Sequence, residues 1–120
     1  MDFNISSEVN PGKQQASIAL EGELDAYTSD TVRETVIGLV RDGYTKLLFD
    51  LGKLSYLDSS GLGVLVGALR RTREREGQVV VVTDNPRLLR LFELTGLEKV
   101  LTLVPTRDEG LALLEGGEGQ

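Results

Sequence analysis

The segment Asp58-Ser59-Ser60-Gly61 carries the residues of this 120-residue chain whose types and spacing could do chemistry. A serine hydroxyl beside an aspartate can cap a helix, attack an electrophile or accept a phosphoryl group. Asp and Ser are also among the commonest residues at helix N-caps. Taken alone, these four residues favour a capping role, so a chemical role needs support from the rest of the sequence.

Enzymatic chemistry at Ser59 lacks the partners that it needs. The chain contains no histidine and no cysteine, which removes the usual general base, thiol chemistry and structural zinc. Gly61-Leu62-Gly63 does not belong to a complete phosphate-binding glycine pattern, because position 66 is Val. A Ser–Lys pair stays open, although nothing in the sequence places a lysine beside Ser59. We therefore expect no catalytic residue, no metal and no cofactor.

Five segments around this motif have the patterns of β-strands. One alternates between polar and apolar residues, and two contain short continuous apolar runs, which are typical of strands covered on both faces. The N-terminal one has the weakest pattern. The predicted strands are Phe3–Val9, Gln15–Gly22, Lys46–Leu51, Gln78–Thr83 and Val100–Val104.

Four segments carry helical spacing of apolar residues or helix-capping signals. They begin near Thr28, at the Asp58 motif, at Asp84-Asn85-Pro86 and at Thr106-Arg107-Asp108-Glu109. Gly43, Gly77 and Gly96 follow the first three as predicted stops. Strands that alternate with helices predict an α/β fold with a mostly parallel central sheet of about five strands, mixed at the N-terminal strand, and four helices. We expect one domain over residues 1–115 and a flexible C-terminal tail over residues 116–120.

The second helix is predicted to have three different faces. Its main apolar stripe, expected to face the core, consists of Leu62, Leu65, Val66 and Leu69. A thinner face of small side chains consists of Gly63, Val64, Gly67 and Ala68. Packing against a neighbouring helix is the expectation for this thinner face, and a docking groove is the alternative. The basic end of the helix consists of Arg70, Arg71, Arg73 and Arg75; a solvated face is expected there, with a phosphate or RNA site as the alternative.

The bulk composition excludes several classes of partner. A formal net charge of −6 argues against nucleic acid, because binding to the phosphate backbone relies on a basic surface. No stretch approaches the roughly 20 apolar residues that span a bilayer, and the N-terminus does not resemble a signal peptide. We therefore expect a cytoplasmic protein without a membrane partner.

The context of the serine motif carries a family resemblance over nearly the whole chain. The stretch from Leu48 to Leu65 closely resembles the signature of STAS-domain anti-sigma-factor antagonists. Gly22-Glu23-Leu24-Asp25 before the first helix and Thr95-Gly96-Leu97 after the third helix match the same family in the same order. The resemblance implies a binding protein of the STAS fold that acts as a switch.

The resemblance also implies how the switch is set. In that family the serine at the position of Ser59 is phosphorylated by a partner that is both an anti-sigma factor and a serine kinase. The unphosphorylated antagonist binds this partner and releases the sigma factor, and a PP2C-type phosphatase resets it. The implied partner-binding residues are Asp25, Asp58, Ser59, Ser60, Gly61, Leu62, Thr95 and Gly96.

Two alternatives stay open beside this interpretation. The chain could be a non-switching scaffold or interaction module of the same fold, in which Ser59 only caps a helix and copies associate, a weak homodimer included. Asp25 could contact the partner or simply form the turn before the first helix. The same two roles are open for Tyr27 and Thr28, with weaker support for a partner contact.

Overall fold

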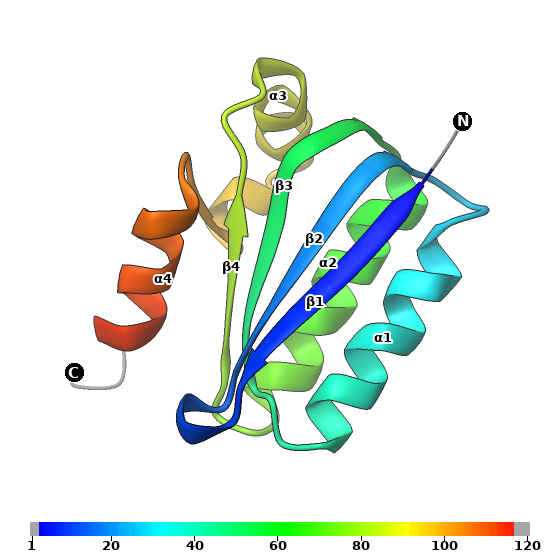
Figure 1. Cartoon of the computed structure of the whole chain (residues 1–120). Coiled ribbons are helices and arrows are strands. Elements are labelled where there is room, and N and C mark those ends of the chain that lie inside the picture. The colour runs from blue at the N-terminus through cyan, green and yellow to red at the C-terminus, as the bar shows by residue number, and fades with distance from the viewer. Residues whose placement is uncertain (1–2, 117–120) are drawn as a thin grey trace.

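A five-stranded sheet runs through the centre of the computed structural model, which describes residues 3–116 (Figure 1). Its strands are β1 (Asn4–Asn10), β2 (Gln15–Leu24), β3 (Lys46–Leu57), β4 (Gln78–Val82) and β5 (Thr102–Val104). Their spatial order is β1-β2-β3-β4-β5. β1 pairs antiparallel with β2, and the other neighbours are parallel. The predicted mixed sheet with an antiparallel N-terminal strand is confirmed.

Four α-helices connect or follow these strands, as the sequence predicts. They are α1 (Ser29–Arg41), α2 (Ser59–Arg73), α3 (Pro86–Thr95) and α4 (Arg107–Gly116). Two short 3-10 turns, η1 (Pro11–Lys13) and η2 (Leu97–Lys99), complete the connections. The three parallel crossovers all step in one direction along the sheet, and their right-handedness places α1, α2 and α3 on one face. α4 lies against the opposite face, over β3 and β4 (Figure 1).

The sheet therefore separates two apolar cores of unequal size. The larger core lies under α1, α2 and α3 and includes the fully buried Ile18, Phe49 and Phe92. The smaller core lies under α4 and consists of Leu48, Val80, Val82 and Leu114. Because β3 and β4 are covered on both faces, they carry the continuous apolar runs that predicted buried strands.

The third strand is longer than its sequence pattern suggests. We expected it to stop at Leu51 before a brief connection, but β3 continues through Gly52 and Lys53 to Leu57. The register against β2 shifts between Ala19 and Glu21, where β3 contributes one residue more than its neighbour. A bulge of this kind absorbs a residue without ending the ladder, so Gly52 lies within the strand.

The buried arc of α2 is rotated from the one we predicted. Leu62 and Leu65 are buried as expected, whereas Val66 and Leu69 are only partly buried. The residues that complete the buried arc are Gly61, Val64, Ala68 and Thr72. α2 packs against α1 as well as β3 and β4, and this double contact turns the small residues Val64 and Ala68 inward. The prediction is therefore wrong for Val66, whereas Leu69 is only partly buried but still packs against the larger core.

The remaining differences are confined to element ends. β5 begins at Thr102 rather than Val100, because residues 97–99 form a 3-10 turn. α4 includes Gly116, which we expected in the flexible tail. The rest of that predicted tail, residues 117–120, lies outside the described residues.

Candidate functional site

The ends of β2 and β3 meet at the N-terminus of α2. The backbone N–H of Asp58 donates to the carbonyl of Leu24 at 3.3 Å, which holds the start of α2 beside the loop that follows β2. Leu24 and Leu57 are also paired in the parallel ladder. Residues 25–28 and 58–60 therefore share the carboxyl edge of the sheet, where α/β folds commonly place binding sites.

Asp58, and not Ser59, caps α2. Its Oδ1 accepts hydrogen bonds from the backbone N–H groups of Ser60 at 2.9 Å and Gly61 at 3.2 Å. Its carbonyl accepts from the N–H of Leu62 at 2.9 Å, and its backbone is extended, as is usual at an N-cap. The aspartate of the motif thus satisfies the helix N-terminus by itself.

Ser59 is the first residue of α2 and is exposed. Within residues 3–116 its hydroxyl has no hydrogen-bond partner, so nothing in this part of the chain competes for its Oγ. A kinase can reach a side chain in this position without disturbing the core. Ser59 therefore lies at the surface, and the predicted helix start at the Asp58 motif is confirmed.

Two of the expected contact residues, Gly61 and Leu62, lie inside the protein. The side chain of Leu62 is 7% exposed, and Gly61 is buried against Leu24 and Leu57. A Cβ on Gly61 would collide with the Leu57 side chain and would lie 2.8 Å from Leu24 Cγ. These residues position the start of α2, and the structure corrects their assignment to the partner surface.

Asp25 forms the turn between β2 and α1. Its Oδ1 accepts from the backbone N–H groups of Tyr27 at 2.9 Å and Thr28 at 3.1 Å. The Thr28 hydroxyl accepts from the N–H of Asp25 and donates to the carbonyl of Glu23. The turn presents Tyr27, which is 94% exposed. The sequence favours Asp25 over Tyr27 as a contact residue, whereas the structure exposes Tyr27 and engages Asp25 in the turn.

Thr95 and Gly96 end α3. The Thr95 hydroxyl donates to the carbonyls of Leu91 and Phe92 in its own helix, and Gly96 takes the left-handed conformation, with φ of 76°, that terminates it. Among the described residues, no hydrogen bond or ion pair joins them to the Asp58-Ser59-Ser60 segment. Their place in a partner surface rests on the family resemblance alone.

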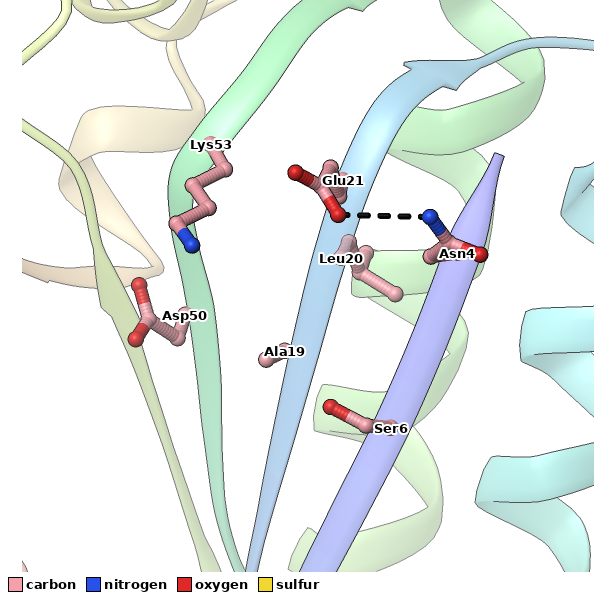
Figure 2. Close-up of a pocket in the computed structure, with 7 residues that line it drawn as sticks. All are labelled: Asn4, Ser6, Ala19, Leu20, Glu21, Asp50 and Lys53. Carbon is pink, nitrogen blue, oxygen red and sulfur yellow. Dashed lines mark hydrogen bonds between the residues drawn. The ribbon is translucent and has the colours of Figure 1, made fainter. Parts of the chain in front are cut away.

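A pocket of about 230 Å³ lies on the sheet face opposite α1 and α2 (Figure 2). Polar side chains from β1, β2 and β3 surround it, among them Asn4, Glu21 and Lys53. Asn4 Nδ2 donates to Glu21 Oε1 at 3.3 Å, and Asp50 accepts from the N–H of Gly52 and lies 3.8 Å from Arg107. The carboxylates of Glu21 and Asp50 thus already interact with neighbouring groups. The pocket lies on the opposite face of the sheet from α2, which carries Ser59.

Neither a metal centre nor a membrane span is found among residues 3–116. No group of three or more acidic side chains is arranged to hold a metal ion there. None of the described helices combines the length and the apolar character that crossing a bilayer requires.

Comparisons with known proteins agree on one family. The family model described as "STAS domain" matches residues 4–110. The anti-sigma-B factor antagonist of Listeria monocytogenes is 40% identical over 103 residues, which cover 84% of this chain and 90% of that protein.

Solved structures support the same fold. An anti-sigma factor antagonist from Mycobacterium paratuberculosis superposes with a TM-score of 0.82 at 28% identity, covering 95% of both chains. The phosphorylated form of the Bacillus cell fate determinant SpoIIAA superposes with a TM-score of 0.70, covering 92% of this chain and 96% of that one. Its 23% identity makes this second likeness one of fold alone.

Proposed function

Because this chain belongs to the STAS-domain family, and within it to the anti-sigma-factor antagonists, we propose that it is a phosphorylation-controlled partner switch. In its unmodified form it binds an anti-sigma factor that is also a serine kinase, and this binding frees the sigma factor. Phosphorylation of Ser59 ends the binding, and a PP2C-type phosphatase restores it. Such a protein acts on transcription and therefore in the cytoplasm.

One observation carries the proposal: Ser59 is exposed at the start of α2 and its hydroxyl is free of partners among the described residues. A serine kept only for capping would bond to the helix N-terminus, but Asp58 already does so. This favours the switch over the alternative of a non-switching scaffold. SpoIIAA, a protein of the same fold, has been solved in a phosphorylated form, so this fold tolerates phosphorylation.

Electrostatics suggest how a phosphate would act. It adds about −1.5 to −2 charges at neutral pH, which the positive end of the α2 dipole partly stabilises. Asp58 lies next to it and already occupies two of the free N–H groups, so the gain is small. We infer that the phosphate leaves the fold in place and blocks docking by its bulk and charge.

The test is phosphate transfer by the serine-kinase anti-sigma factors of the same genome, each purified and supplied with ATP. One phosphate should appear on Ser59, with Ser59→Ala abolishing the label and Ser60→Ala keeping most of it. Ser60 is the matched control, because its N–H is bonded to Asp58 one position further along the same turn. Mass spectrometry that finds the phosphate mainly on Ser60, or finds none with any of these kinases, would reject the assignment.

The chain is proposed to bind rather than to catalyse. With no histidine or cysteine, Ser59 has no ordinary base to activate it. Purified protein should hydrolyse neither ATP nor phosphoesters, and its melting temperature should be unchanged by a chelator. Turnover that survives re-purification and is lost in Ser59→Ala would contradict this.

A further inference from the structure

An apolar groove of about 420 Å³ runs beside the second half of α2. Its lining residues are Val66, Leu69, Arg70, Arg73, Glu74 and Val100. Val66 and Leu69 belong to the predicted apolar stripe of α2 and are partly exposed, although Leu69 also packs against the larger core. Val100, just after η2, is 45% exposed and contributes from outside α2. The groove is therefore an open apolar surface and not a packing defect within the core.

This groove continues the helix face that begins at Ser59. With about 100° of rotation per residue, positions seven, eleven and fourteen after Ser59 return to within about 40° of it. Those positions are Val66, Arg70 and Arg73. Gly63, on the same face between Ser59 and Val66, is exposed, and a Cβ there would meet nothing within 4 Å. One uninterrupted face about 21 Å long thus leads from the serine to the last turn of α2.

The charges along this face are unbalanced. Arg70 and Arg73 are exposed and form no ion pair with any described carboxylate, although Glu74 lines the same groove. Arg33, Arg41, Arg90 and Arg107 are paired with carboxylates. Arg71, Arg75 and Arg87 also form no ion pair with a described carboxylate, but they do not line this groove. On a chain of net charge −6, two unpaired guanidinium groups beside apolar side chains form a local site for an acidic partner.

We propose that this groove binds an acidic amphipathic helix of the same partner that docks at Ser59, so that the contact runs along α2 from Ser59 to Arg73. The inference rests on the proposed function, because it assigns the groove to that partner. Apolar side chains of the partner helix cover Val66, Leu69 and Val100, while its carboxylates face Arg70 and Arg73. The absence of a side chain at Gly63 lets the partner approach closely between the serine and the groove.

Charge reversal tests the proposal with the anti-sigma factor kinase that phosphorylates Ser59. Arg70→Glu and Arg73→Glu should each weaken its binding to the unmodified protein about tenfold or more and flatten the salt dependence of the affinity. Arg71→Glu is the matched control: it makes the same charge change on the same helix, about 120° away from Ser59, in a hollow shared with α1. It should change the affinity less than about twofold. Thermal melting of each variant verifies the fold.

A second measurement follows the apolar part of the groove. Methyl NMR signals of Val66, Leu69 and Val100 should shift when the partner is added to the wild-type protein. If the partner binds and responds to Ser59→Asp, but ignores Arg70→Glu and Arg73→Glu, the groove proposal is wrong and the switch stands. If the unmodified wild-type protein does not bind the kinase, both the groove proposal and the proposed switch are wrong. Arginine-dependent binding of RNA or anionic vesicles, with partner affinity unchanged, would also overturn the proposal.

Discussion

The carboxylate of Asp58 accepts a hydrogen bond from the backbone N–H of Ser60 at 2.9 Å. Ser59 lies between these two residues in the sequence, and its side chain takes no part in the cap. Asp58 and Ser59 are both common N-cap residues, but only Asp58 caps this helix. Asp58 stabilises the helix start, and Ser59 is left exposed. A modification of Ser59 can therefore change the surface without dismantling the helix.

The first prediction concerns this cap. Asp58→Ala removes the acceptor of two N–H groups and should lower the free energy of unfolding by about 0.5–2 kcal/mol. Asp58→Asn should keep most of the stability, because asparagine caps as well as aspartate does. Urea denaturation of both variants measures the difference. Equal stability of Asp58→Ala and wild type would mean that the cap contributes nothing.

The second prediction compares two glycines two positions apart on α2. A methyl group at Gly61 meets Leu24 and Leu57, so Gly61→Ala should destabilise the protein by about 1–3 kcal/mol. A methyl group at Gly63 meets nothing within 4 Å, so Gly63→Ala should be neutral or stabilising by up to about 1 kcal/mol, as helix propensity suggests. Thermal or chemical denaturation distinguishes them. The same sign and size of effect at both positions would show that close packing at Gly61 is unimportant.

The third prediction concerns Tyr27, which the Asp25 turn holds 94% exposed at the same edge as Ser59. Exposed tyrosines often dominate binding energies once a partner buries them. Tyr27→Ala should leave the unfolding free energy within about 0.5 kcal/mol of wild type and weaken binding of the anti-sigma factor about tenfold. Isothermal titration calorimetry measures the affinity. Tyr44, half-buried against the core, offers a contrast, because Tyr44→Ala should lower stability instead.

The sequence predicts the fold well because the spacing of its apolar residues changes sharply between the strands and the helices. The alternating pattern of Gln15–Gly22 and the apolar run at Lys46–Leu51 each match an observed strand. The extra length of β3 beyond Leu51 depends on its pairing with β2, where the register shifts by one residue. Local pattern cannot show a register shift that depends on a neighbouring strand.

The candidate site could be predicted only in part, for a similar reason. Asp58 and Ser59 are both good N-caps, so residue type alone cannot say which of them bonds to the helix and which stays free. The apolar positions of α2 are spread around a wide arc, and the positions of α1 and the sheet decide which side of it is buried. Val66 therefore has the spacing of a core residue but lines a groove, and Leu69 lines the same groove while packing against the core.

The central claim is that negative charge on Ser59 blocks docking while leaving the fold intact, and Ser59→Asp tests it most directly. The variant places a carboxylate at the exposed start of α2, so its unfolding free energy should stay within about 1 kcal/mol of wild type. Its binding to the anti-sigma factor should weaken by roughly 2–5 kcal/mol, which is about thirtyfold or more. Leu65→Asp is the opposite control, because burying an unpaired charge there should unfold the domain.

The deciding measurement is the dissociation constant of the anti-sigma factor for wild type and for Ser59→Asp, determined on samples whose melting curves are recorded alongside. The account predicts nearly coincident melting curves and an affinity lost by a factor of about thirty or more. A Ser59→Asp variant that binds as tightly as wild type, or that loses binding only because it melts far below it, would contradict the account.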